Sequence, residues 1–238
     1  MHRTSNLADA DPCRRRHSPH RLAWLLGLIC LASITTASAR PDPDRVVQST
    51  LASVRDAIVS ETAAIAANAQ AARQLIRRTL IPRVDTRATA RYVLAQQWGQ
   101  AQPAQQEAFH GAFHDHAVAT YGLLLHRFAD RVAEVLNGLR FSSETVRQNE
   151  QTALVRTTFQ TPGGTDQTVR IHLHARDGEW LLFDAEYAGF SLLSIWRAEI
   201  QGRLGRQALP ELITALRERH SDDNTVAPGI DEPRAGGD

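Results

Sequence analysis

Histidines stand in two groups whose spacing could hold a metal ion. His110 and His114 are four residues apart in a segment predicted to be helical, with His116 close by, and His172 and His174 alternate in a predicted strand. Paired imidazoles on one face can ligate zinc or copper. The chain has no H-E-x-x-H motif, and the two groups would have to converge to complete a site. We therefore interpret them as solvated or hydrogen-bonded histidines and expect no metal or other cofactor.

Asp184 and Ser191 are the candidates for acid–base or nucleophilic chemistry. Asp184 lies among apolar neighbours in a predicted strand, where a partly buried carboxylate can act as a general base. Ser191 follows Gly189 and Phe190, which is not the G-x-S-x-G pattern of hydrolases, and it is well placed to cap a helix. Because no nucleophile or metal motif accompanies either residue, we predict no catalytic residue.

Three further polar side chains could contact a ligand. The planar donor fork of Arg197 suits a phosphate group, although an ion pair with Asp184 or Glu186 would use the same donors. Tyr121 and Tyr187 each combine an apolar ring with a hydroxyl that needs a partner. That combination fits a pocket rim and a core equally well, so the alternatives stay open for all three.

The elements that must position these residues begin with helices. Apolar residues recur at helical spacing from Asp44 to about Asn137. Asp85 or Thr86 offers an N-cap, and Pro103 suits the first turn of the longest helix. We expect four helices here, over residues 46–58, 75–81, 86–98 and 103–139.

After Leu139 the hydrophobic period changes to two, which indicates an antiparallel meander. The predicted strands and the helices that follow cover residues 152–160, 167–175, 179–187, 191–206 and 209–220. Turns at 162–164 and 176–178 separate the strands, and in the second strand apolar side chains alternate with Arg170 and the two histidines. The pattern predicts an α+β domain in which helices cover one face of a curved antiparallel sheet of about four strands, similar in shape to NTF2-like or cystatin-like folds.

The two ends of the chain differ from the middle. Residues 1–39 have a basic start, a short apolar run and a final Ala-Ser-Ala, as in a cleavable secretory signal. The apolar run is too short for a comfortable membrane span. Lipidation at Cys30 is disfavoured because no small residue precedes it. We expect a signal peptide over 1–39, one domain over 40–220 and a disordered tail over 221–238.

Composition excludes several classes of protein. Cys13 and Cys30 are the only cysteines and both lie in the predicted signal, so the mature chain has no disulfide and no thiolate site. All basic residues are arginines, and without the first 39 residues the chain carries 22 of them against 24 acidic residues. This near neutrality argues against a nucleic-acid binder.

One block of sequence carries a resemblance to a known family. Residues 180–197 resemble the W-x-x-x-D-x-x-x-x-G-x-S-L…R signature of the periplasmic phospholipid carriers of the Mla pathway, the MlaC or toluene-tolerance family. The matching positions are Trp180, Asp184, Gly189, Ser191, Leu192 and Arg197. Upstream, the family pattern has an aspartate before a helix, a tryptophan that ends it, then a proline, a glutamine, two phenylalanines and a tyrosine. The corresponding residues here are Asp85, Trp98, Pro103, Gln106, Phe109, Phe113 and Tyr121.

Two positions depart from the family pattern. Ala95 stands where the family usually has glycine, which puts the close helix contact expected there in doubt. Trp196 replaces the more usual tyrosine before Arg197. Even so, the resemblance covers most of residues 44–218.

The resemblance implies a non-enzymatic carrier. Family members move phospholipid through the periplasm between an MlaA-like lipoprotein complex of the outer membrane and an MlaFEDB-like ABC transporter complex of the inner membrane, so contact with the membrane itself is transient. Exposing acyl chains to water costs about 0.8 kcal/mol per CH₂, so a carrier must enclose them. We expect the chains to enter an apolar pocket between the long helix and the packed face of the sheet.

The candidate lipid-binding residues combine apolar liners with polar groups at the mouth. They are Phe113, Tyr121, Leu124, Phe128, Val155, Ile171, Leu173, Phe183, Tyr187 and Arg197. The apolar members would also make an ordinary core. Three other hypotheses stay open: a carrier of a hopanoid or other polycyclic lipid, a periplasmic NTF2-like enzyme that uses Asp184 with a histidine, and an adaptor that binds only protein.

Overall fold

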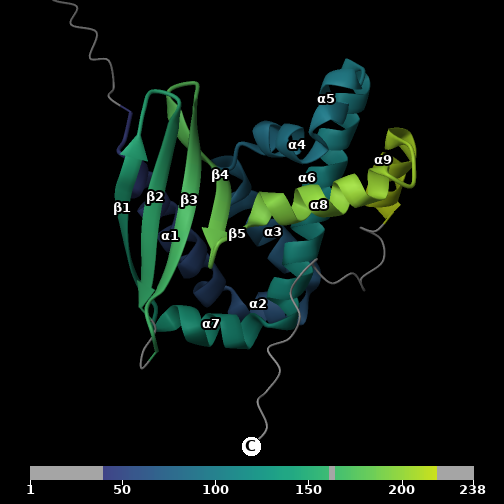
Figure 1. Ribbon diagram of the computed structural model, residues 1–238. Helices are drawn as coiled ribbons and strands as arrows, with labels where there is room; N and C mark the ends of the chain where they lie inside the picture. Colours follow the sequence, from purple (N-terminus) through teal and green to yellow (C-terminus); the bar gives the residue numbers. More distant parts are fainter. Residues whose placement is uncertain (1–39, 161–163, 219–238) are drawn as a thin grey trace, which may run out of the picture. The chain divides into compact units, whose positions relative to one another are not determined.

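The computed structural model describes residues 40–160 and 164–218. The predicted signal peptide (1–39), part of the turn predicted at 162–164 and the predicted tail (221–238) lie outside the described residues. Helices precede the sheet and two more follow it (Figure 1). The elements are α1 (Pro43–Ser60), α2 (Thr62–Ala67), α3 (Ala69–Thr79), η2 (Ile81–Arg83), α4 (Thr86–Leu94), α5 (Gln96–Gln100), α6 (Pro103–Arg127), α7 (Ala129–Asn137), β1 (Arg140–Gln148), β2 (Thr152–Gln160), β3 (Gln167–Arg176), β4 (Glu179–Tyr187), β5 (Phe190–Ser191), α8 (Leu192–Leu204) and α9 (Leu209–Glu218).

The sheet is an antiparallel meander in the order β1-β2-β3-β4-β5. It has four long strands and a fifth of two residues, so the predicted α+β architecture is confirmed. The strand β1 (Arg140–Gln148) was not predicted. In its second half the strand carries few apolar side chains, and Val146 sits in a bulge that interrupts the pairing with β2.

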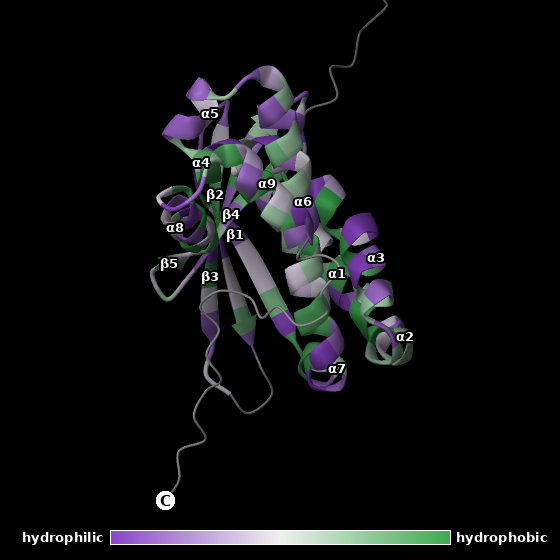
Figure 2. Ribbon diagram, turned by 90° about the vertical axis from the view of Figure 1, so that its right-hand side faces the viewer, coloured by the Kyte–Doolittle hydropathy of each residue, from purple (hydrophilic) through white to green (hydrophobic). Residues whose placement is uncertain are grey.

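Three apolar clusters hold the layers together. The first packs α4, α6, α8 and α9 against one another around Trp196 and Phe109. The second fixes α1 on the sheet through Val47, Val155 and Leu173. The third joins α1, α2, α3 and α7 around Ile65. Hydrophobic and hydrophilic residues alternate along α1, α3 and α7, as expected of helices that bury one face (Figure 2). No helix in the described part of the chain is long and apolar enough to cross a membrane.

The helix predicted over residues 103–139 is two helices, and this part of the prediction is wrong. The chain leaves helical geometry at Phe128, whose φ is −114° and ψ 22°. The Phe128 side chain is 42% exposed, whereas Ala129 directly after it is buried. The break redirects α7, so that Val132 and Leu136 pack against the α1–α3 cluster instead of continuing the line of α6.

Strand β4 contains a bulge that breaks its predicted alternation. Leu173 pairs with Leu182 and His172 with Asp184, which leaves Phe183 as an extra residue without a partner on β3. The packed face therefore passes from Leu182 to Ala185, not from Leu182 to Asp184 as strict period two predicts.

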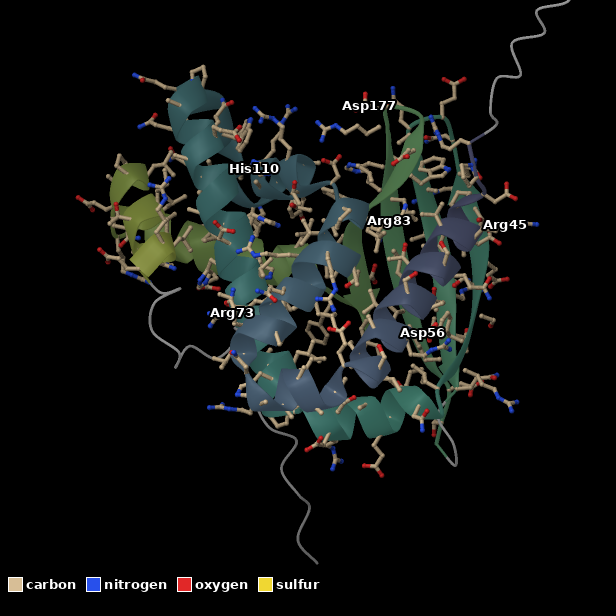
Figure 3. All side chains as sticks on the ribbon, turned by 180° about the vertical axis from the view of Figure 1, so that it is seen from behind. Arg45, Asp56, Arg73, Arg83, His110 and Asp177 are labelled. Carbon is tan, nitrogen blue, oxygen red and sulfur yellow. The ribbon has the colours of Figure 1, made fainter. Side chains whose placement is uncertain are left out.

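Helices α3 and α6 cross at Gly122, close to Arg73 (Figure 3 labels Arg73 on α3). A Cβ on Gly122 would lie 2.5 Å from Cγ of Arg73 and 3.2 Å from its backbone nitrogen. The backbones can approach this closely because residue 122 has no side chain.

Gly122→Ala is expected to lower the free energy of unfolding by about 1–3 kcal/mol, because the added methyl overpacks the crossing. Gly111→Ala, on the same helix with no atom within 4 Å of the added Cβ, is the matched control. It should raise stability by up to about 1 kcal/mol. Urea unfolding measures the free energy of unfolding of both variants. If both variants change it equally, α3 can move away from α6 without cost and the crossing is not overpacked.

Ala95 joins α4 to α5 with φ 54° and ψ −126°, a backbone region that suits glycine. This backbone conformation explains why the family pattern has glycine here. A side chain in such a region costs on the order of 1–3 kcal/mol.

Ala95→Gly should stabilise the protein by about 1 kcal/mol, since relief of strain exceeds the added chain entropy of glycine. The expected rise in Tm is about 2–4 °C for a domain of this size. Ala101→Gly is the control, because Ala101 has an ordinary φ of −75° and its replacement should lower Tm. A fall in Tm for both variants would show that the backbone of Ala95 is not strained.

Candidate functional site

A partly open apolar cavity of about 320 Å³ lies between the sheet and the helices. From the sheet it is lined by Phe159, Val169, Ile171, Leu182, Phe183, Asp184 and Ala185. From the helices and their connections it is lined by Leu51, Ile76, Leu80, Ile81, Val84, Thr86, Thr89, Phe113, His114, Ala117, Val118, Tyr121, Leu192, Leu193 and Trp196. Among these liners, Leu192 in the first turn of α8 is 38% exposed.

Helix α6 presents one stripe to this cavity, because positions 113, 117 and 121, with 114 and 118, repeat at helical spacing. The far wall depends on the edge of β4. The segment after η2 pairs with that edge, through a parallel bridge from Val84 to Leu182 and a hydrogen bond of 2.8 Å from the Asp85 nitrogen to the Leu182 oxygen.

The Asp184 carboxylate fixes the junction of sheet and helix. Its Oδ1 accepts hydrogen bonds from the backbone nitrogens of Ala185 (2.8 Å) and Leu193 (3.0 Å), and its Oδ2 accepts one from the Ser191 hydroxyl (2.6 Å). The Ser191 oxygen in turn accepts from the Ser194 nitrogen at 3.0 Å, which confirms Ser191 as the N-cap of α8. A negative charge at a helix N-terminus is favourable, so this carboxylate holds α8 against β4.

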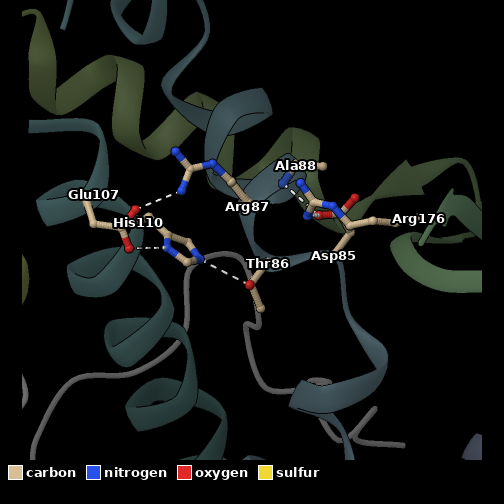
Figure 4. A network of polar contacts seen from close by, with 7 residues as sticks. All are labelled: Asp85, Thr86, Arg87, Ala88, Glu107, His110 and Arg176. Atoms are coloured by element: carbon tan, nitrogen blue, oxygen red, sulfur yellow. Dashed lines mark hydrogen bonds and ion pairs between the residues drawn. The ribbon is translucent and has the colours of Figure 1, made fainter. Parts of the chain in front are cut away.

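A second carboxylate fixes the start of α4 (Figure 4). Asp85 is 5% exposed and caps the helix by accepting from the Ala88 nitrogen at 3.0 Å. It also accepts from the Arg176 guanidinium of β3 at 2.7 Å. Nearby, His110 Nε2 lies 3.1 Å from the Thr86 hydroxyl. The first turn of α4 is thus tied to both the sheet and α6, and this turn places Thr86 and Thr89 on the cavity.

Tyr121 and Trp196 form a polar contact in an otherwise apolar wall. The Trp196 indole nitrogen donates to the Tyr121 hydroxyl oxygen at 2.8 Å. Trp196 is 2% exposed and meets the rings of Phe113, His116 and Tyr121 edge-on, with centroids 5.6–6.1 Å apart. Burial raises the pKa of Tyr121 to about 12, so the hydroxyl is a neutral donor at physiological pH.

The structure brings four of the ten predicted lipid-binding residues to the cavity: Phe113, Tyr121, Ile171 and Phe183. Val155 and Leu173 lie instead in the cluster under α1, where they are 0% and 1% exposed. Leu124 lies beyond the last turn of α6 that faces the cavity, and Phe128 is at the exposed end of that helix.

Tyr187 and Arg197 also lie outside the cavity lining. Tyr187 is 52% exposed and donates its hydroxyl hydrogen to Gln167 at 2.7 Å. Arg197 lies over the Tyr92 ring, with its guanidinium carbon 5.0 Å from the ring centroid. Within residues 40–160 and 164–218, neither Asp184 nor Glu186 pairs with it.

The two histidine groups have separate structural partners. His172 Nε2 lies 3.7 Å from a carboxylate oxygen of Glu186, and His174 Nδ1 lies 3.7 Å from one of Asp85. The His174 ring stacks on Phe183 with the ring centroids 3.9 Å apart. His114 lines the cavity, and burial lowers its pKa against the opposing charge of Asp115. In the described part of the chain, no three His, Cys, Asp or Glu side chains come together as a metal site would require.

Several liners were missed by the sequence analysis, notably Leu51, Ile76, Leu80, Ile81 and Val84. For Leu80 and Ile81 the signal was the apolar pair before Pro82, directly after the end of α3, where the chain enters η2 and contacts β4. Helical spacing identified Ile76 and Leu80 as a buried face, but it could not show that this face meets a cavity.

Comparison with known proteins identifies the family. A family model described as MlaC protein matches residues 48–218. The chain belongs to the MlaC family. A solved structure, that of a phospholipid-binding protein from Ralstonia solanacearum in complex with a phospholipid, is similar with a TM-score of 0.63 and 18% sequence identity. The similarity covers 77% of this chain and 99% of that one, so the MlaC-family domain has the same fold.

Asp184→Ala is expected to lower the free energy of unfolding by about 2–4 kcal/mol, because three donors lose a charged acceptor. Asp184→Asn keeps one acceptor oxygen and should cost about half as much. Glu186→Gln, two residues along the same strand, removes a carboxylate that pairs with the half-exposed Arg170 and should cost less than about 1 kcal/mol. Urea unfolding measures the loss of stability in the three variants. Equal losses for Asp184→Ala and Glu186→Gln would show that the hydrogen bonds of Asp184 stabilise the protein no more than a surface ion pair does.

Proposed function

We propose that this protein is a periplasmic carrier of phospholipid that holds acyl chains in the cavity between α6, α8 and the sheet. The observation that carries the proposal is the cavity itself. Its wall is apolar except for a few polar side chains, and it is partly open. The volume of about 320 Å³ falls in the range of ligand sites, about 300–1,000 Å³.

The apolar wall favours hydrocarbon as the occupant, because apolar groups gain free energy when they leave water. Residues of the first and second apolar clusters line this cavity. Acyl chains would fill it, and each buried CH₂ contributes about 0.8 kcal/mol.

Transfer partners follow from membership of the family. We propose that the carrier exchanges lipid with an MlaFEDB-like transporter complex of the inner membrane and an MlaA-like lipoprotein complex of the outer membrane, and that residues 1–39 direct it to the periplasm. Lipid in a bilayer is already in hydrocarbon, so moving it into the cavity gains little free energy. Net transport therefore requires energy supplied by a partner.

Binding without catalysis is supported by the state of Asp184. Its two oxygens accept three hydrogen bonds that fix the fold, and the nearby histidines contact Glu186 and Asp85 instead. A general base needs a free acceptor within reach of a substrate proton.

Native mass spectrometry of the full chain, expressed with its own leader and purified from the periplasm, tests the carrier directly. We expect bound diacyl phospholipid at fixed stoichiometry, identified after extraction. A hopanoid or other polycyclic lipid would redirect the cargo assignment. A lipid-free protein under gentle conditions would overturn the proposal.

Ala117→Phe tests whether the cavity is the binding site. Ala117 lines the cavity from the middle of α6, so a phenyl ring there should occupy space that a lipid needs. We expect at least a tenfold loss of retained phospholipid with little change in Tm. Ala104→Phe, an exposed position near the start of the same helix, is the control and should retain lipid normally. Equal lipid content in the two variants would place the lipid elsewhere.

A further inference from the structure

Most polar side chains in the cavity wall already have partners. Asp184 accepts three hydrogen bonds, and the Thr89 hydroxyl donates to the backbone carbonyl oxygen of Thr86 at 2.8 Å. The Thr86 hydroxyl lies 3.1 Å from His110 Nε2. Two lining side chains, Tyr121 and His114, retain hydrogen-bonding capacity that no described residue uses.

His114 is the weaker of the two as a ligand contact. Its Nε2 atom has no hydrogen-bond partner among the described residues, but it is enclosed by protein. A molecule in the cavity would therefore meet the carbon edge of the ring. Burial also favours the neutral ring, as expected for an imidazole in an apolar wall.

Tyr121 is different because its partner leaves its hydrogen available. An indole N–H can donate but cannot accept, so the bond from Trp196 makes the Tyr121 oxygen the acceptor. The phenolic hydrogen must then point away from Trp196, and no described residue accepts it. A buried tyrosine hydroxyl normally finds a partner for this hydrogen. Accepting one bond also strengthens the bond that the hydroxyl can donate.

We infer that the Tyr121 hydroxyl donates a hydrogen bond to an ester carbonyl oxygen of the lipid cargo, and that this contact selects acyl-ester lipids. The inference rests on the carrier function proposed above. Its structural basis is a hydroxyl whose acceptor side is taken by Trp196, in a wall made mostly of aliphatic and aromatic side chains.

An ester carbonyl fits this donor better than a phosphate oxygen does. The residues that line the cavity include no arginine or lysine, so a phosphate drawn into it would lose hydration without gaining a counter-charge. A carbonyl is a neutral acceptor that lies between the acyl chains and the headgroup of a glycerophospholipid. It can enter the wall with the chains while the charged headgroup stays in water.

The experiment compares two lipids that differ only in this acceptor. Purified full-length carrier is incubated with vesicles that contain equal amounts of a diacyl phosphatidylethanolamine and its dialkyl ether analogue, and native mass spectrometry counts what it retains. We expect the ester lipid to be retained about two- to tenfold more than the ether lipid, the range for one neutral hydrogen bond.

Tyr121→Phe keeps the ring and removes the hydroxyl, so the two lipids should then be retained equally. Tyr187→Phe is the matched control, because the Tyr187 hydroxyl is outside the cavity and donates to Gln167; its ester preference should equal that of the wild type. Thermal unfolding checks that both variants are folded. The wild-type preference is a test in itself and does not depend on the variants.

The outcomes separate this inference from the carrier function. Equal retention of both lipids by the wild type, or a preference that survives in Tyr121→Phe, overturns the inference and leaves the carrier intact. Retention of neither lipid overturns the carrier function itself.

Discussion

The cavity depends on one carboxylate. Asp184 follows the bulge of β4 and joins this strand to the start of α8 by accepting from the Ser191 hydroxyl and the Leu193 nitrogen. Helix α8 then carries Leu193 and Trp196 into the cavity wall and Ile200 into the cluster with α9. The bulge at Phe183 contributes to the same junction, because the extra residue changes which side chains of β4 face the packed side of the sheet before the chain turns. The carboxylate that the sequence analysis weighed as a general base therefore positions one wall of the cavity.

The wall and the core share the same helices. Helix α6 buries Phe109 and Ala112 in the cluster around Trp196, while Ala117 and Val118 line the cavity. Phe113 belongs to both. Because packed clusters deform little, they give the cavity a defined shape. Gly122 extends this arrangement toward α3, where the close crossing brings Ile76 and Leu80 to the opposite side of the cavity.

Periodicity predicted the elements well and their interruptions poorly. It identified the meander and the buried face of β3, because burial of one face imposes a period on the sequence. Residue type and position identified Ser191 as a helix cap. It missed the break at Phe128 and the bulge at Phe183, where tertiary packing overrides local pattern. It also could not divide one face between core and cavity. Ile171 and Leu173 are equivalent by pattern and both pack in the cluster under α1, yet only Ile171 of the two also lines the cavity.

Trp196 shows how a departure from the family pattern can change the chemistry of a site. The pattern usually has tyrosine at this position, and a tyrosine hydroxyl can donate or accept. Two facing hydroxyls could satisfy each other in either direction. An indole allows one direction, so Tyr121 must accept from Trp196 and direct its own hydrogen elsewhere. The large indole also fills the space among Phe113, His116 and Tyr121 and leaves the Tyr121 ring little freedom to turn. One substitution thus fixes both the orientation and the polarity of a donor in an apolar wall, which is a means of discriminating among lipids that bury the same hydrocarbon.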